Sequence, residues 1–122
     1  MRLKKIFLGV ASFLAASFFA INVFAARTDM VDLSSNNNSG NVISTSQFVS
    51  LRNNYGIKAV TVKLSEGQTY RWSGAAQTIA NAKAAGLYTN GYHFARYSTL
   101  SGAQAEANNA VTAAQSDGLG TG

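Results

Sequence analysis

The 122-residue sequence predicts an α/β fold of about three repeating strand–helix units, because three observations agree. Three short apolar-rich runs have the length of strands, at residues 30–34, 59–63 and 88–94. Each run is followed by a segment with apolar residues at helical spacing. Two glycines suited to helix ends, Gly56 and Gly86, lie 30 residues apart, which is the length of one such unit.

The first unit begins with the strand at 30–34 and continues into a loop rich in serine and asparagine. Side chains of these two types bond to their own backbone, which favours turns. A helix is predicted to start after Ser44 or Ser46, because Phe48, Leu51 and Tyr55 then recur on one face.

The second and third units repeat this order. The strand at 59–63 precedes a helix at 75–85, and the strand at 88–94 precedes a helix from Ser101 or Gly102 to about Ser116. The last helix is predicted to turn a small apolar face to the sheet, formed by Ala103, Ala107, Ala110, Val111 and Ala114. Alanine side chains bury little apolar area, so we expect weak docking of this helix. The third strand is expected to leave an unpaired edge.

The N-terminus has the pattern of a secretory signal peptide over residues 1–25. Basic residues open the chain, an apolar run covers residues 6–21, and Val23-Phe24-Ala25 forms a small-any-small cleavage site. The apolar run is shorter than the roughly 20 residues that span a bilayer as a helix. We therefore expect a secreted or cell-wall protein comprising residues 26–122, with an uncleaved membrane anchor as the alternative.

Charge and composition exclude several function classes. The net charge is +5, but three of the ten basic residues lie in the predicted signal, so nucleic-acid binding is not expected. The sequence contains no cysteine, which rules out disulfides and thiol chemistry. His93 is the only histidine and has no cluster of ligands around it in sequence, so we predict no metal and no cofactor.

Three strings stand where the predicted strands run into loops: Asp32-Leu33-Ser34, Lys63-Leu64-Ser65-Glu66-Gly67 and Tyr92-His93-Phe94. In this order and spacing they resemble the family 25 glycoside hydrolases, the lysozymes (N-acetylmuramidases) of bacteria and phages. The resemblance covers residues 29–117. It implies the N-terminal part of a TIM-like βα barrel, with a truncated family 25 domain at residues 26–122, because such barrels usually need about 200 residues or more.

The implied activity is hydrolysis of the β-1,4 bond between N-acetylmuramic acid and N-acetylglucosamine in peptidoglycan. In the family, the general acid is a glutamate in an aspartate-any-glutamate string on the fourth strand, and this sequence has no such string. We therefore expect the catalytic acid to be absent. The alternatives are a non-catalytic peptidoglycan-binding remnant, a truncated product that does not fold stably, and a membrane-anchored peptide.

The resemblance places Asp32 on the floor of the cleft as the catalytic candidate, orienting or stabilising the sugar. Its other interpretation is a helix or turn cap. The resemblance assigns Glu66 to the substrate site but not to proton donation. Asp32 and Glu66 could form a catalytic pair only at the carboxyl separations of about 5–9.5 Å that glycoside hydrolysis needs. Lys63 is either a solvated strand end or the charge that keeps Glu66 ionised.

Four aromatic residues are candidates for stacking on sugar rings: Tyr92, Phe94, Tyr70 and Trp72. Core packing is the other interpretation of Phe94, whereas Tyr70 and Trp72 are expected in an exposed polar loop. Strand alternation puts His93 on the face opposite Tyr92 and Phe94, where we expect an orienting role. The remaining acidic residues, Glu106 and Asp117, are predicted in or at the end of the last helix.

Overall fold

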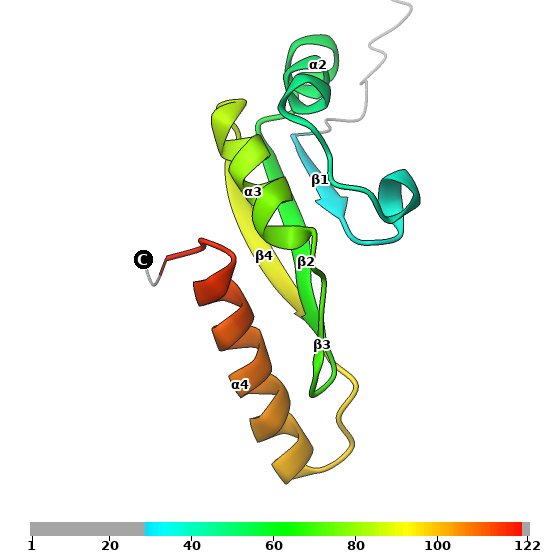
Figure 1. The fold of residues 1–122 in the computed structure, drawn as a ribbon, viewed down its shortest axis with the longest axis vertical. Coiled ribbons are helices and arrows are strands. Elements are labelled where there is room, and N and C mark those ends of the chain that lie inside the picture. Colours follow the sequence, from blue (N-terminus) through cyan, green and yellow to red (C-terminus); the bar gives the residue numbers. More distant parts are fainter. Residues whose placement is uncertain (1–28, 121–122) are drawn as a thin grey trace, which may run out of the picture.

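The computed structural model describes residues 29–120 and shows a mixed α/β fold; the predicted signal at residues 1–25 lies outside this range. Apart from one short extra strand, strands and helices alternate along the described chain (Figure 1). The elements are β1 (Met30–Leu33), the short 3-10 turn η1 (Asn37–Gly40), α2 (Thr45–Tyr55), β2 (Ala59–Glu66), β3 (Tyr70–Arg71), α3 (Ala75–Ala84), β4 (Tyr88–Phe94) and α4 (Leu100–Ser116). The three predicted strands and three predicted helices are all present.

The centre of the sheet is β2, which pairs along both edges. On one edge β1 runs parallel to it, with Asp32 opposite Thr61, and on the other edge β4 runs parallel along its whole length. The short strand β3 pairs antiparallel with the last two residues of β2, on the edge that β1 has left free. The strand order is therefore β1-β2-β4, with β3 beyond the end of β1.

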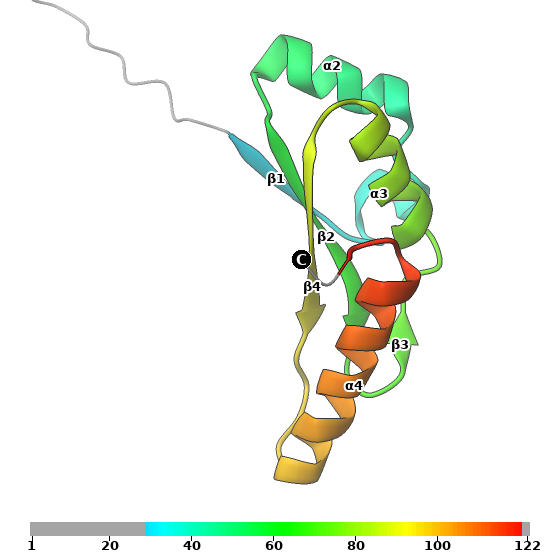
Figure 2. The same cartoon turned by 90° about the vertical axis from the view of Figure 1, so that its left-hand side faces the viewer.

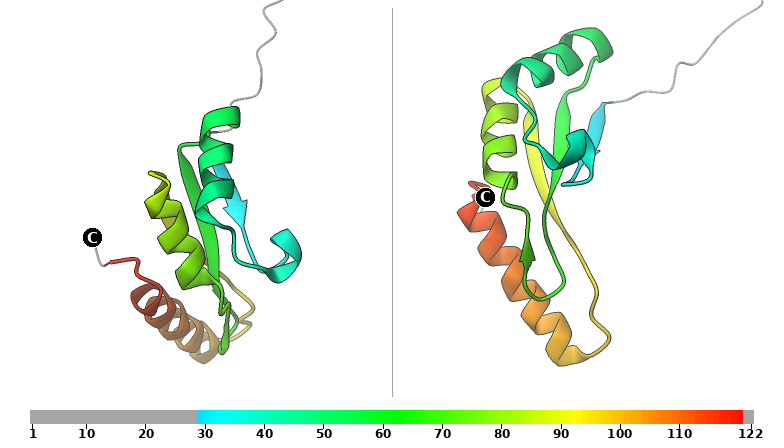
Figure 3. Two further views of the ribbon diagram at one scale, coloured as in Figure 1. Left: turned by 45° about the horizontal axis from the view of Figure 1, so that its top comes forward. Right: turned by 45° about the vertical axis from the view of Figure 1, so that its right-hand side comes forward.

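Helices α3 and α4 lie on one face of this sheet (Figure 2). Helix α2 lies beside α3, at the end of the sheet where the strands begin (Figure 3). Between the sheet and the helices sits a core that includes Phe48, Val60, Val62 and Ile79, all 1% exposed or less. In the described part of the chain no helix covers the opposite face, which we call the helix-free face.

The ends of the helices follow from local sequence. Ser44 caps α2, and its hydroxyl and the side chain of Gln47 satisfy each other's backbone N–H groups in a capping box. Gly56 then ends the helix with a φ of 69°, a left-handed conformation that suits glycine. Both features confirm the predicted limits of this helix.

The predicted inner face of α4 is only partly correct, because Ala114 packs against the core and Ala103 and Ala110 are half-buried, but Ala107 and Val111 are exposed. The residues buried on this helix are Gly102, Glu106, Asn109 and Ala113, whereas Val111 is 57% exposed. The physical reason is polar: Glu106 and Asn109 make hydrogen bonds to the ends of the strands, and these directional contacts set the rotation of the helix. Across residues 29–120, no helix combines the length and apolar character needed to cross a membrane.

Candidate functional site

A β-bulge near the end of β2 decides which side chains share a face. Lys63 pairs with Tyr92, but Ser65 pairs with His93 and Glu66 with Phe94, so one extra residue of β2 is accommodated at Leu64. Side chains of paired residues in parallel strands point to the same side. Lys63, Glu66 and their partners on β4 therefore lie on the helix-free face. The bulge also explains why β2 extends to Glu66 and does not end at residue 63 as predicted.

Glu66 is held between two cations on the helix-free face. Its Oε2 pairs with Lys63 Nζ, and its Oε1 accepts a hydrogen bond from Arg96 Nε at 2.7 Å. The bond from Lys63, and after it the bond from Arg96, lowers the pKa of the Glu66 carboxyl, against the opposing effect of burial. Lys63 is 9% exposed, so it is not a solvated strand end. Of its two predicted interpretations, the structure supports the one in which it keeps Glu66 ionised.

Two aromatic rings make cation–π contacts with Lys63 and Arg96. The Phe94 ring centroid lies 5.0 Å from Lys63 Nζ and 4.7 Å from Arg96 Cζ, and the Tyr70 centroid lies 5.7 Å from Lys63 Nζ. Phe94 and Tyr70 are 45% and 42% exposed, so both keep open ring surface. The hydroxyl of Tyr70 also donates to Ser35 Oγ at 3.0 Å, which ties β3 to the loop after β1.

Asp32 reaches the helix-free face from β1. It stands opposite Thr61, two residues before Lys63 on β2, and is exposed. Burial, the negative charge of Asp32 and a hydrogen bond to its carboxylate raise the pKa of the Tyr92 hydroxyl. The N-caps of the described helices are other residues, so Asp32 is not a helix cap. The structure thus brings Asp32, Lys63, Glu66 and Tyr92 onto one surface.

Trp72 does not belong to this surface, and the prediction that it lies in an exposed loop is wrong. It is 6% exposed and is part of the hydrophobic core. Its backbone N–H donates to the carbonyl of Leu64 at 2.9 Å, which draws the residue inward after β3. Its indole fills the space beside Gly74, where a Cβ atom would lie 2.9 Å from Trp72 Cε2. The ring is therefore not available for stacking on a sugar.

A second polar group lies on the helix side of the sheet. His93 Nδ1 is 2.9 Å from Ser65 Oγ, and His93 Nε2 is 2.9 Å from Glu106 Oε2. As expected, His93 faces away from Tyr92 and Phe94. Glu106 is 3% exposed and also accepts from the Arg96 backbone N–H. The bonds from His93, foremost, and from Arg96 lower the pKa of Glu106, although burial opposes them.

Sequence reasoning did not assign Glu106 to any site. The signal that could have found it is its spacing on α4, because Gly102, Glu106, Asn109 and Ala113 follow one another at helical intervals and form a stripe. A carboxylate on such a stripe must have partners when it is buried. Asp117 follows the last residue of α4, close to its predicted place, and burial raises its pKa.

Comparison of the chain with known protein families finds one match. Residues 31–121 match the family model described as "Glycosyl hydrolases family 25". The chain belongs to this family. No curated protein matches it.

Two solved structures are similar to this family 25 chain. One is the CTP1L endolysin, with 42% identity and a TM-score of 0.52 over 63% of this chain and 26% of the endolysin chain. The other is a muramidase from Trichobolus zukalii, with 30% identity and a TM-score of 0.43 over 54% of this chain and 33% of the muramidase chain. The family 25 chain therefore covers about a quarter to a third of these two proteins.

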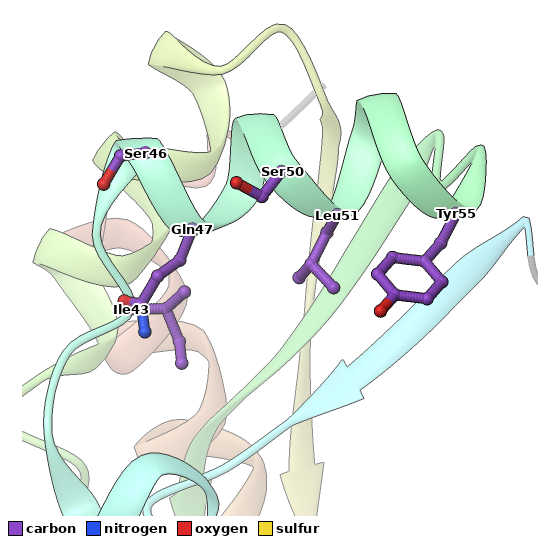
Figure 4. Close-up of a pocket in the computed structure, with 6 residues that line it drawn as sticks. All are labelled: Ile43, Ser46, Gln47, Ser50, Leu51 and Tyr55. Atoms are coloured by element: carbon purple, nitrogen blue, oxygen red, sulfur yellow. The ribbon is translucent and has the colours of Figure 1, made fainter.

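Elsewhere in this family 25 chain, a mostly apolar hollow lies along α2 (Figure 4). It measures about 370 Å³ and is lined by Ile43, Ser46, Gln47, Ser50, Leu51 and Tyr55. None of these residues is an acid, a histidine or a cation, so the hollow offers no acid–base chemistry. Among residues 29–120, no group of three or more histidines and carboxylates is placed to hold a metal ion.

Proposed function

We propose that this chain is the N-terminal part of a peptidoglycan-cleaving lysozyme that acts on the bond between N-acetylmuramic acid and N-acetylglucosamine. The observation that carries the proposal is the meeting of Asp32, Glu66, Tyr92 and Phe94 on the helix-free face of a family 25 chain. The names of the two similar structures, an endolysin and a muramidase, agree with this substrate.

The proposed architecture is the first three βα units of a TIM-like barrel. In support, β1, β2 and β4 are parallel and each new strand is added on the same side of the last. Right-handed crossovers then put the connecting helices on one face, as in a closed barrel. In that architecture the helix-free face is the barrel interior, and Asp32 and Glu66 stand toward the carboxyl ends of the strands, where barrel enzymes hold their substrates.

The proposed roles follow from charge and exposure. Asp32 is exposed, with Tyr92 bonded to it, and it orients or stabilises the reacting sugar. Glu66 contacts substrate as a carboxylate, because an acid held ionised by Lys63 and Arg96 has no proton to donate. Tyr70 and Phe94 supply the exposed ring surfaces. Protonation of the leaving sugar oxygen then requires an acid that residues 29–120 do not place on this face.

The test is an assay of new reducing ends on purified peptidoglycan, together with cosedimentation. Since general acid catalysis typically contributes 10²- to 10⁴-fold, we expect the chain to bind peptidoglycan and release few or no reducing ends. Asp32→Asn and Glu66→Gln should weaken binding. Asp29→Asn, which changes the same kind of carboxylate near the start of β1, is the matched control. Robust hydrolysis that Asp32→Asn and Glu66→Gln abolish would instead make those two residues a working pair.

A second candidate function is non-catalytic binding of peptidoglycan by the same surface. It is favoured by the exposed rings of Tyr70 and Phe94, which lie beside cations and need no proton transfer to hold a sugar. Binding without release of reducing ends, in a chain that also gains no activity when the remaining strands of the domain are supplied, would favour this candidate over the enzyme.

We also propose export to the cell wall. Residues 1–25 act as a cleaved signal, residues 26–122 carry the family 25 segment, and the membrane is contacted only through an uncleaved signal. The partner is peptidoglycan and no nucleic acid is involved. Mass spectrometry of the secreted protein should find a chain beginning at Ala26. Recovery of membrane-bound protein with Met1 intact would favour the anchor.

A further inference from the structure

The contacts around Glu106 form a closed ring that joins the two faces of the sheet. Ser65 Oγ contacts His93, His93 contacts Glu106, Glu106 accepts from the Arg96 backbone, and the Arg96 side chain donates to Glu66. Ser65 and Glu66 are neighbours on β2, so the last contact returns to the strand where the first began. Ser65 and Glu66 lie on β2, His93 lies on β4 and Arg96 follows β4. Only Glu106 comes from a helix, α4.

Proton positions in the ring follow from its chemistry. A carboxylate only accepts hydrogen bonds, so His93 Nε2 carries a proton and donates a hydrogen bond to Glu106. The remaining Nδ1 is hydrogen-bonded to the buried hydroxyl of Ser65. His93 is thereby fixed at both nitrogens, and it fixes one oxygen of Glu106 in turn.

The backbone of Arg96 depends on Glu106. Arg96 lies two residues beyond the end of β4, outside the strand ladder, and its N–H donates to Glu106 at 3.1 Å to Oε1 and 2.9 Å to Oε2. The side chain of Arg96 is 62% exposed and holds Glu66 Oε1 through Nε. A long, exposed side chain keeps one geometry only when its backbone is fixed, because its rotamer entropy opposes order.

We propose that Glu106 is a positioning residue for Glu66: from the opposite face of the sheet it fixes the backbone of Arg96, and so aims the guanidinium at the Glu66 carboxylate. Burial of a carboxylate is costly, and packing alone would be served by an apolar residue at this place on α4. That Glu66 contacts substrate rests on the proposed function. The positioning itself rests on the hydrogen bonds alone.

The test uses the two glutamates of the chain, Glu66 and Glu106. In the full 122-residue chain with carbon-13 in the glutamate carboxyl groups, Glu106→Gln leaves one glutamate signal, that of Glu66. The new amide keeps one acceptor oxygen, but whichever way it turns its NH₂ group lies within 3.1 Å of the Arg96 N–H, so one of the two contacts to Arg96 becomes donor against donor. We expect the pKa of Glu66 to rise by about 0.5, a roughly threefold gain in proton affinity.

Two further variants separate positioning from general destabilisation. Arg96→Ala should raise the pKa of Glu66 directly, and adding Glu106→Gln to it should raise that pKa no further, since the guanidinium through which Glu106 acts is gone. Ile79→Val, a buried change on α3, lowers thermal stability and should leave the pKa of Glu66 unchanged. Lys63 and Tyr92, the other ionisable groups whose interactions with Glu66 or its charge are resolved, remain in every variant.

An unchanged pKa of Glu66 in Glu106→Gln would overturn the proposal, as would a rise that persists in full without Arg96. If Glu106→Gln does not fold, Glu106→Asp is the substitute. It keeps the charge, withdraws the carboxylate by one methylene, and is subject to the same expectation and the same refutation. The measurement needs no activity. A chain that fails to bind peptidoglycan but shows the pKa rise would remove the proposed function and leave the positioning role in place.

Discussion

Replacing Gly91 by alanine tests how closely β4 lies against β2 just before Tyr92. A Cβ atom at this position would lie 2.5 Å from Cδ1 of both Leu64 and Leu119, and 2.8 Å from Leu64 Cγ. Leu64 is 3% exposed, so its branch point has little room to move. Overpacking of this kind costs about 1–3 kcal/mol, and alanine recovers about 0.5–1 kcal/mol of chain entropy relative to glycine. The expected net loss of stability is about 1 kcal/mol.

For a domain of this size, a loss of 1 kcal/mol lowers the melting midpoint by about 4–8 °C, which a thermal melt followed by near-ultraviolet circular dichroism can measure. Gly120→Ala is the control, because nothing lies within 4 Å of its added Cβ. In a background with both Leu64→Ala and Leu119→Ala the clashes disappear, so Gly91→Ala should become neutral or stabilising. An unchanged midpoint for Gly91→Ala alone would refute the reasoning.

Three other outcomes are expected. Because Glu66 and Glu106 have lowered pKa values, they add to the free energy of unfolding above about pH 4.3, the ordinary pKa of glutamate. This added stability is lost as the pH falls through their folded pKa values, which urea titrations at a series of pH values should show. The Lys63→Met variant should lose less stability over the same pH range, because Glu66 then lacks its lysine partner. Trp72→Ala should lower the free energy of unfolding, measured by heat or urea, by about 3–5 kcal/mol because the indole is buried. A loss below about 1 kcal/mol would mean that the Trp72 side chain is exposed. Ser44→Ala should cost about 1 kcal/mol and speed hydrogen exchange in the first turn of α2, since the capping box is lost.

Much of the fold could be predicted because the signals are local. The serine and glycine at the ends of α2 lie within one turn of the groups they satisfy, and the apolar runs of the strands are short and distinct. The surface that gathers Asp32, Glu66 and Tyr92 was also within reach, since the ends of parallel strands meet at one edge of a sheet.

The parts that could not be predicted depend on contacts far apart in sequence. Trp72 is buried because of a backbone bond to Leu64 and the space beside Gly74. The rotation of α4 is set by Glu106 and Asn109, whose partners lie 10 to 42 residues away. The spacing of residues along a helix shows which of them share a face, but it does not show which face finds hydrogen-bond partners on the sheet.

The bulge at Leu64 has a consequence for reading strands by parity. Side chains on the same face of a regular strand are separated by an even number of residues, yet Lys63 and Glu66 differ by three and still share a face. An odd number of residues between two side chains that pair on one strand therefore indicates a bulge between them. Deleting one residue from positions 64–65 would make the interval two, so a regular strand without the bulge would still keep Lys63 and Glu66 on one face. The bulge is therefore needed only because β2 carries the extra residue, and the ion pair does not depend on the bulge itself.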